Sequence, residues 1–460
     1  MFVIAIGAFL VPKSLQLIQM TFIMPHKNKA YMELCNVIIK DSRYGYCKAN
    51  LSIELGYIKN IVIIDTDPKS FYNAEFYVSP GFVNSHLHPN QLLDRRILDG
   101  QNISELLHNM HGNYKKNDEE RYAQALLVLI EAIKSGATSI YSVASNPYPV
   151  IRAFNTLDLK GAITCFYNDR WEGFGTPPAL SILNAIENQF TKAYAEKTTK
   201  VDIHIGSASV ESASNELLFL IDDLAKRFKT KVNLHISEGI ESVKSCTKSR
   251  LTSPVRLLSQ LGILASHWNL IHAVNIDEDE IAMIANAGAC VIHCPVSNAK
   301  TGVGVAPIKK FMEYGITLGL GSDACSNNNT NNILNEAYFA VLLQAAFHTD
   351  AKVVSIETLM KWMTENGYQI LGTKQKGKIE IGESADLLLW SLHESAFVPL
   401  AYGKYDSTLI YNAPDIKPHS ILMDGKIIVE DYQFKTISEK EVRETANQCG
   451  MKLFSFLKRL

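Results

Sequence analysis

The middle of the chain alternates between short apolar runs and longer amphipathic stretches. Helical spacing of apolar positions is predicted over 118–135, 214–228, 253–261 and 277–287, with β-prone apolar runs between these stretches. Alternation of strand and helix over about 300 residues is typical of a parallel barrel. The pattern therefore predicts the α/β class and, within it, a (β/α)8 TIM barrel over residues 78–374.

Both ends of the chain have a different sequence pattern from the middle, with short strand-like runs separated by turns. The predicted strands are 35–39, 51–55, 58–64, 385–390 and 420–429. Because the two ends of a closed barrel lie near each other, we expect the flanking segments to meet. They would form a small β-sandwich domain, built from residues 31–77 plus 375–460, beside the catalytic barrel.

Residues 1–30 form an N-terminal extension of uncertain role. Two apolar runs in it are divided by a proline and a lysine, so neither a clear secretory signal nor an unbroken spanning helix is present. Three interpretations stay open: an upstream extension before a later start, a helix packed on the protein, or membrane targeting. The later starts to consider are Met20, Met24 and Met32.

Composition excludes some classes of partner without naming the function. The 460 residues are 47% hydrophobic and 20% charged, so a large core can form. A net charge of -2 gives no general attraction to nucleic acid or to acidic membranes. The 8 cysteines form no C-x-x-C pair, which is typical of a reduced, cytoplasmic protein. We expect a small-molecule partner, no nucleic acid and no membrane, with a homodimer left open.

Two histidines end the first predicted barrel strand. His86 and His88 are one residue apart, so their side chains point to the same face of a strand. The alternative is that they only cap the strand end. Matching polar residues further along the chain favour a shared site.

Three later strand ends carry further polar residues. His235 is followed three positions on by Glu238, His272 ends the next strand, and Asp323 follows a run of small residues. Three neutral imidazoles and a carboxylate suit a divalent transition metal, with zinc expected and iron as the other option. Glu238 could then move protons for a water at the metal.

Alternatives remain for each of these residues. A lone histidine such as His235 is more often a core residue, although the neighbouring Glu238 shifts the balance towards function. His272 could be a fourth nitrogen ligand, but an acid/base role beside the attacking water suits it better. Asp323 could instead cap a helix.

Residues 290–298 offer a competing metal site. Cys290, His293 and Cys294 are all potential ligands, but their spacing fits no usual zinc finger. We therefore predict that this segment is a strand followed by a loop, lining the pocket and presenting Asn298.

The segments that carry these residues resemble the amidohydrolase superfamily. Within it, they are similar to the branch of cytosine, guanine and S-adenosylhomocysteine deaminases and chlorohydrolase-like triazine hydrolases. The carrying segments are 80–88, 234–238, 270–274, 293–298 and 319–324, with 377–387 and 424–426 resembling the returning β strands. The resemblance spans residues 31–431.

The resemblance implies a role for each residue. The metal ligands would be His86, His88, His235 and Asp323. Glu238 would be the proton shuttle, His272 would orient water or polarise the substrate, and Asp323 would also take part in catalysis. No lysine lies at the end of the strand near His204, where relatives with two metals have one, so one metal ion is expected.

The substrate is the least determined feature. Gln91 matches a glutamine that contacts the substrate ring in some relatives, and we also expect contacts from Arg170, Trp171 and Asn298. Isolated surface residues such as Arg170 are, however, more often solvated. Ala208 or Ser209 stands where adenosylhomocysteine-type deaminases have a substrate-touching histidine, which weakens the case for a nucleoside thioether.

Together these features imply a metal-dependent aminohydrolase. It would attack an amino-bearing carbon of a purine-, pterin- or pyrimidine-like ring and release ammonia. Alternatives are hydrolysis of another C–N bond or a C–Cl bond on such a ring, and deamination of S-adenosylhomocysteine or methylthioadenosine. A non-catalytic scaffold is a distant alternative, because all six inner residues are present.

Overall fold

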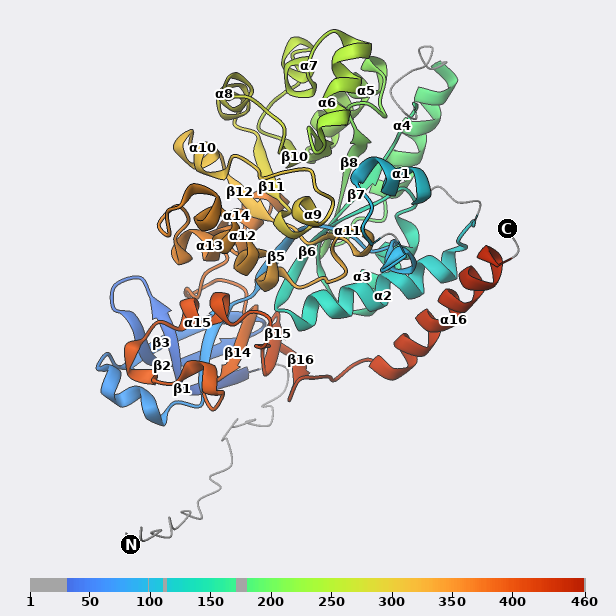
Figure 1. Ribbon diagram of the computed structural model, residues 1–460. Helices are drawn as coiled ribbons and strands as arrows, with labels where there is room; N and C mark the ends of the chain where they lie inside the picture. The colour runs from blue at the N-terminus through green and yellow to red at the C-terminus, as the bar shows by residue number, and fades with distance from the viewer. Residues whose placement is uncertain (1–30, 98, 111–113, 171–179, 459–460) are drawn as a thin grey trace, which may run out of the picture.

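The computed structural model describes residues 31–97, 99–110, 114–170 and 180–458. The predicted N-terminal extension, residues 1–30, lies outside this description. Figure 1 shows a helix-covered barrel next to a second sheet, which contains strands from both ends of the chain.

The barrel is a closed parallel sheet. Its strands, in spatial order, are β5 (Phe82–His88), β6 (Ala137–Ala144), β7 (Lys160–Phe166), β8 (Val201–Ser209), β9 (Val232–Ile236), β10 (Trp268–His272), β11 (Cys290–His293), β12 (Leu318–Leu320) and β13 (Asp323–Ala324). Only two residues separate β12, which pairs with β11, from β13, which pairs with β5. These two are therefore halves of one eighth strand, and the predicted (β/α)8 barrel is confirmed.

Helices surround this sheet (Figure 1). They are α1 (Ile103–Met110), α2 (Asp118–Lys134), α3 (Tyr148–Thr156), α4 (Leu180–Tyr194), α5 (Asn215–Phe228), α6 (Ile240–Arg250), α7 (Pro254–Gln260), α8 (Glu278–Ala287), α9 (Pro295–Lys300), α10 (Ile308–Glu313), α11 (Cys325–Asn328), α12 (Ile333–His348), α13 (Ile356–Met363) and α14 (Glu365–Leu371). The four predicted helices match α2, α5, α7 and α8 to within a residue or two. Capping boxes at Asn117/Glu120 and Asp277/Glu280 fix the starts of α2 and α8.

The second sheet joins the two ends of the chain. Its strands, in spatial order, are β17 (Gln433–Phe434), β16 (Lys426–Glu430), β15 (Ser420–Met423), β14 (Leu387–Ser391), β4 (Phe76–Pro80), β1 (Tyr31–Asp41), β2 (Gly45–Glu54) and β3 (Tyr57–Asp65). The pairing of β4 with β14 connects the N-terminal to the C-terminal strands. The expectation that both ends build one β unit is therefore confirmed.

Two C-terminal features differ from the sequence-based expectation. Residues 420–429 form a hairpin rather than one strand, because Asp424 and Gly425 have φ of 47° and 69° and make a tight turn. An Asp-Gly pair between apolar runs is a strong hairpin signal. Helix α16 (Glu439–Leu457) then leaves the sheet and packs along α2, where Lys134 Nζ lies 2.8 Å from Glu439 Oε1 (Figure 1).

The last helix, α16, had a readable signal. Val442, Ala446, Cys449 and Leu453 are buried at spacings of four, three and four, which is the pattern of an amphipathic helix. None of the helices in the described residues is long and apolar enough to cross a membrane.

Candidate metal centre and active site

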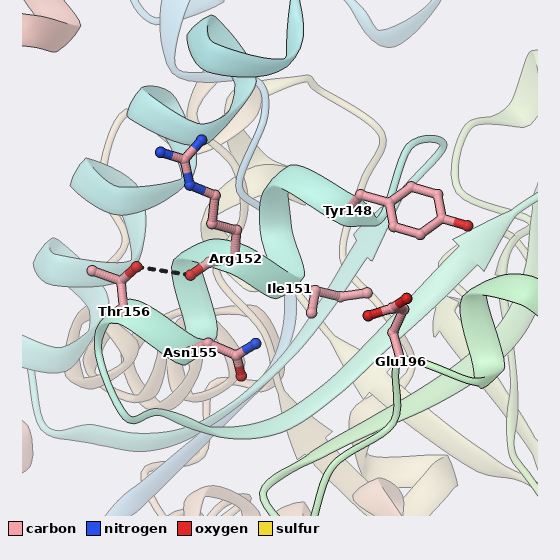
Figure 2. Close-up of a pocket in the computed structure, with 6 residues that line it drawn as sticks. All are labelled: Tyr148, Ile151, Arg152, Asn155, Thr156 and Glu196. Carbon is pink, nitrogen blue, oxygen red and sulfur yellow. Dashed lines mark hydrogen bonds between the residues drawn. The ribbon is translucent and has the colours of Figure 1, made fainter.

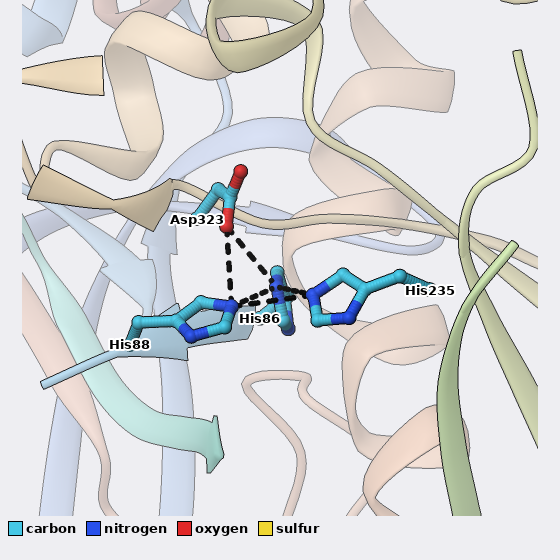
Figure 3. A group of neighbouring side chains, drawn as sticks. All are labelled: His86, His88, His235 and Asp323. Atoms are coloured by element: carbon cyan, nitrogen blue, oxygen red, sulfur yellow. Dashed lines mark hydrogen bonds and ion pairs between the residues drawn. The ribbon is translucent and has the colours of Figure 1, made fainter. Parts of the chain in front are cut away.

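Four side chains converge at the carboxyl ends of the barrel strands (Figure 3). The Nε2 atoms of His86 and His88 are 3.0 Å apart, and each lies 3.2 Å from His235 Nε2. Asp323 Oδ1 lies 3.3 Å from the Nε2 atoms of His86 and His88. These are the four residues that the sequence predicted as metal ligands, and the structure brings them together.

Local strand geometry explains this convergence. His86 and His88 come from the end of β5, and Asp323 starts β13, which pairs with β5 opposite Leu87. A Cβ atom on Gly321 would lie 2.6 Å from His86 Cβ, so only glycine allows this approach. The helix-cap alternative for Asp323 is wrong, because the N-cap of α11 is Ala324 and it makes no side-chain cap.

The donor atoms fit a divalent cation. The Nδ1 atom of His235 donates to the carbonyl oxygen of Ala208, so its Nε2 atom presents a lone pair to the other imidazoles. Burial lowers the pKa of His86 and of His235, and it lowers the pKa of His88 to about 3. Neutral imidazoles are the form that ligates metal. Ligands about 2.1 Å from a tetrahedral zinc lie about 3.4 Å apart, close to the separations seen here.

Hydrogen bonds hold the carboxylate of Asp323 in place. Its Oδ2 atom accepts from Ser297 Oγ at 2.5 Å and from Asn327 Nδ2 at 3.0 Å, which leaves Oδ1 directed at the imidazoles. Burial raises the pKa of Asp323, but His86 and the other imidazoles outweigh burial and hold it well below its usual value. Asp323 is therefore an anion at neutral pH.

Glu238 and His272 lie beside this cluster. His272 Nδ1 donates to Asn298 Oδ1 at 2.8 Å, so its Nε2 lone pair faces Glu238 Oε1 at 3.6 Å. In the part of the chain that the structure describes, Glu238 Oε1 has no hydrogen-bond partner. Two acceptors that face each other need a proton, a water or a ligand between them.

Burial, together with the charges of Asp323 and Glu211, raises the pKa of Glu238 well above its usual value. A carboxyl group with a raised pKa takes up a proton more readily than an ordinary glutamate and can then pass it on. The backbone is strained at the same strand ends, because Ser237, His272 and Asp323 have φ of 46°, 72° and 59°. Such strain gathers at functional sites.

The predicted substrate-binding residues have different surroundings. Gln91 lies with its Nε2 atom 3.4 Å from His88 Nδ1, and Asn298 holds His272 while its own Nδ2 has no partner among the described residues. Arg170 follows β7, is half-buried and donates its backbone N–H to the carbonyl oxygen of Ser212, and this contact does not place it at the cluster. Trp171 lies outside the described residues.

The competing Cys/His site does not form. Cys290, His293 and Cys294 belong to neither group of potential metal ligands found within residues 31–458, masked positions apart. The segment is strand β11, as predicted, but α9 starts at Pro295 in place of the expected loop. Proline at a first helical position is pre-organised for this, because its φ is already helical.

Sequence reasoning missed several groups that hold the site. Ser297 lies inside the quoted segment 293–298, and Asn327 begins an asparagine-rich run, so both had a signal. The ring of Phe166 packs against the ring of His235, with 5.5 Å between the ring centres, and no sequence motif indicated this contact. The carbonyl oxygen of Ala208 could not be found from side-chain identity at all.

A surface hollow lies away from this chemistry (Figure 2). Five of its residues come from α3, and Glu196 completes it. The guanidinium of Arg152 stacks 3.8 Å from the centre of the Tyr122 ring instead of entering the hollow. None of these residues belongs to the cluster, so we place the candidate site at the barrel mouth.

The chain belongs to the amidohydrolase family, whose family model matches residues 77–428. It is 28% identical over 426 residues to a 5-methylthioadenosine/S-adenosylhomocysteine deaminase of Pyrococcus furiosus, a match that covers 88% of this chain and 96% of the relative. The expectation of a hydrolase that acts on carbon–nitrogen bonds is thereby confirmed.

Two solved structures share the fold. One is an adenosine deaminase from Xanthomonas campestris with bound zinc, with a TM-score of 0.80, 18% identity and coverage of 92% of this chain and 99% of that one. The other is an atrazine chlorohydrolase from Arthrobacter aurescens complexed with zinc, with a TM-score of 0.78, 20% identity and coverage of 90% and 100%. At such identities the likeness concerns the fold alone.

Proposed function

We propose that this protein is a metal-dependent aminohydrolase that removes an amino group from a nitrogen heterocycle as ammonia. One observation carries the proposal. Three imidazole nitrogens and one carboxylate oxygen lie within 3.0–3.3 Å of a neighbour in the cluster, and beside them Glu238 Oε1, which has no hydrogen-bond partner among the described residues, lies 3.6 Å from His272 Nε2. Ligands and a proton carrier at the mouth of one barrel suit hydrolysis at a C–N bond.

The residues that would hold the ion are His86, His88, His235 and Asp323. We propose zinc in preference to iron, and one ion per chain, because His204 contacts Tyr141 and strand β8, Val201–Ser209, carries no lysine that could bridge a second ion. A bound divalent ion acts as a Lewis acid and lowers the pKa of a water to about 7. A hydrolase of this kind needs that nucleophile at neutral pH.

The side chains around the ion would divide the proton transfers. Glu238 takes a proton from the attacking water and passes it to the ring nitrogen beside the amino-bearing carbon. As the water oxygen bonds to this carbon, His272, oriented by Asn298, accepts a hydrogen bond from the water. The second water proton passes to the amino group, the C–N bond breaks, and ammonia leaves.

The ring is proposed to be planar and purine- or pterin-like. The absence of a histidine at Ala208 supports a base over a nucleoside, since a substrate-touching imidazole stands there in the deaminases that the chain resembles. A second candidate is a nucleoside thioether, favoured by the Pyrococcus furiosus relative. Hydrolysis of a C–Cl bond would use the same groups with a different leaving group.

A coupled measurement tests the proposal. Purified protein is analysed for metal content and then assayed for ammonia release across purine, pterin and pyrimidine bases, methylthioadenosine and S-adenosylhomocysteine. We expect close to one zinc per chain and ammonia from a purine- or pterin-like base. Two tightly held ions would overturn the single-metal proposal. A chlorinated triazine is added to the screen, and chloride release from it without ammonia from any of the compounds would overturn the aminohydrolase.

A further inference from the structure

A continuous hydrogen-bonded chain runs outside the proposed ion from one ligand to another. Gln91 lies 3.4 Å from His88 Nδ1 and 3.2 Å from Ser326 Oγ. Ser326 Oγ lies 2.7 Å from Asn327 Oδ1, and Asn327 Nδ2 donates to Asp323 Oδ2 at 3.0 Å. These three residues thus connect the back of His88 with the back of Asp323.

The donors along this chain agree with an ion on His88. A hydroxyl group has one hydrogen, so if Ser326 donates it to Asn327 Oδ1, Ser326 must accept from Gln91. A half-turn of the Gln91 carboxamide then places Nε2 toward Ser326 and Oε1 toward His88 Nδ1. That arrangement requires a hydrogen on Nδ1, which is the tautomer whose Nε2 atom binds a metal.

Both ends of the Gln91 amide are used in this arrangement. The earlier expectation, taken from resemblance, was that Gln91 contacts the substrate ring. An amide with one end on an imidazole and the other on a buried hydroxyl has its orientation fixed by the protein, and it keeps one N–H and one lone pair for other partners. Ser326 is fully buried and Asn327 is 7% exposed, so water does not replace these bonds easily.

We propose that Gln91 is a positioning residue: through Ser326 and Asn327 it ties His88 to Asp323 and sets the affinity of the site for its ion. The inference rests on the proposed function, because it takes these two residues as ligands of one ion. Partners that orient a metal-ligating histidine typically change metal affinity by about 10–100-fold when they are removed.

The test measures zinc binding without any substrate. Metal-free full-length protein competes for zinc with a coloured chelator, which gives the dissociation constant of each variant. Gln91→Leu keeps the size of the side chain and loses both polar ends, and we expect zinc binding about 10–100-fold weaker. Gln91→Glu keeps an acceptor for His88 Nδ1, so its affinity should lie closer to wild type than to Gln91→Leu.

Asn298→Leu is the matched control. It removes an amide from the Nδ1 atom of His272, which is not a ligand in the proposal, so zinc affinity should stay within about twofold of wild type while turnover falls. Thermal unfolding checks that each variant is folded. If Gln91→Leu binds zinc as tightly as wild type but raises KM, Gln91 reads the substrate and the inference is overturned.

A double variant tests the link itself. If Gln91 and Asn327 act through one chain, then Gln91→Leu with Asn327→Leu should weaken zinc binding by less than the product of the two single effects. If the loss of zinc affinity in the double variant equals the product of the two single losses, Gln91 and Asn327 do not connect His88 with Asp323. Wild-type protein that binds no divalent ion would overturn the proposed function as well, whereas unchanged affinity in Gln91→Leu overturns only the inference.

Discussion

The two ends of the barrel use buried polar groups in opposite ways. At the carboxyl end, imidazole nitrogens face one another, and Glu238 Oε1 faces His272 Nε2 at 3.6 Å without a proton donor between them. At the amino end, Lys160 starts β7 and directs its ammonium group at Ser384, Asp386 and Asp424. At the amino end the fold itself supplies the hydrogen-bond partners of the buried ammonium group. At the carboxyl end the facing lone pairs need an ion, a water or a ligand as their partner.

This difference assigns separate tasks to the two ends. An ammonium group with three acceptors offsets much of its own burial, and in doing so it joins the barrel to the second sheet. Converging lone pairs repel each other, and three positive φ values at the same strand ends add strain. Changes at the carboxyl end should therefore alter turnover, and changes at the amino end should alter stability.

Metal removal should have the largest effect. Prolonged chelation is expected to abolish ammonia release and to leave the far-ultraviolet circular dichroism unchanged, because the barrel core does not depend on an ion for folding. Activity should return when zinc is added back. A chelated protein that unfolds would show that the carboxyl end also carries stability, which would break the comparison.

Glu238→Gln should be next in size. The substitution keeps the shape of the side chain but cannot accept a proton, so kcat should fall by about 10²–10⁴-fold. Zinc content, measured by plasma emission, and the unfolding midpoint should match wild type. A variant that retains more than a tenth of wild-type kcat would remove Glu238 from the role of proton shuttle.

Lys160→Met should have the opposite effect to Glu238→Gln: stability should fall, and turnover should not change. The substitution leaves the buried carboxylate of Asp386 without its cation, whereas Asp424 keeps Lys200 as a partner, and breaking a buried pair in this way costs about 3–5 kcal/mol. We expect that loss in the free energy of unfolding by denaturant, with kcat per folded molecule unchanged. Lys426→Met is the control, because Lys426 is 67% exposed where it pairs with Asp158 and should cost less than about 1 kcal/mol.

The sequence was informative about the carboxyl end and silent about the amino end, for a physical reason. His86 and His88 are close in sequence, and strand periodicity alone places them on one face. Lys160 meets Ser384 and Asp424 across 224 and 264 residues. No local pattern signals which distant carboxylate will reach a buried lysine.

Backbone partners of the site residues could not be predicted from the sequence either. The carbonyl oxygen of Ala208 orients His235, and any residue type at that position could supply it. Asn298 was correctly singled out, but its contact in the structure is with His272, since the sequence gives a residue's position and not the direction of its side chain. Helix α16 carried a clear apolar spacing, and its packing against α2 depended on tertiary contacts that spacing cannot show.

The smallest prediction concerns pH and the amino end. Burial of Asp424 opposes its ionisation, but Lys160 and Lys200 outweigh burial and lower the pKa of this carboxyl from 3.8 to about 2. A pKa depressed in the folded state adds stability that is fully present above the unfolded pKa and is lost as pH falls towards about 2. Asp424 is 30% exposed, so we expect this charge to add only about 1 kcal/mol to the free energy of unfolding.

Asp424→Asn should therefore be less stable than wild type by this amount at pH 6, and the difference should shrink steadily between about pH 4 and pH 2. Burial raises the pKa of Asp386, which has the opposite sign, and the charge of Asp424 adds to that rise, so the measured difference also contains a smaller contribution from Asp386. Urea unfolding across this range measures the effect, and a difference that stays constant with pH would show that Asp424 acts through shape and hydrogen bonding instead of charge.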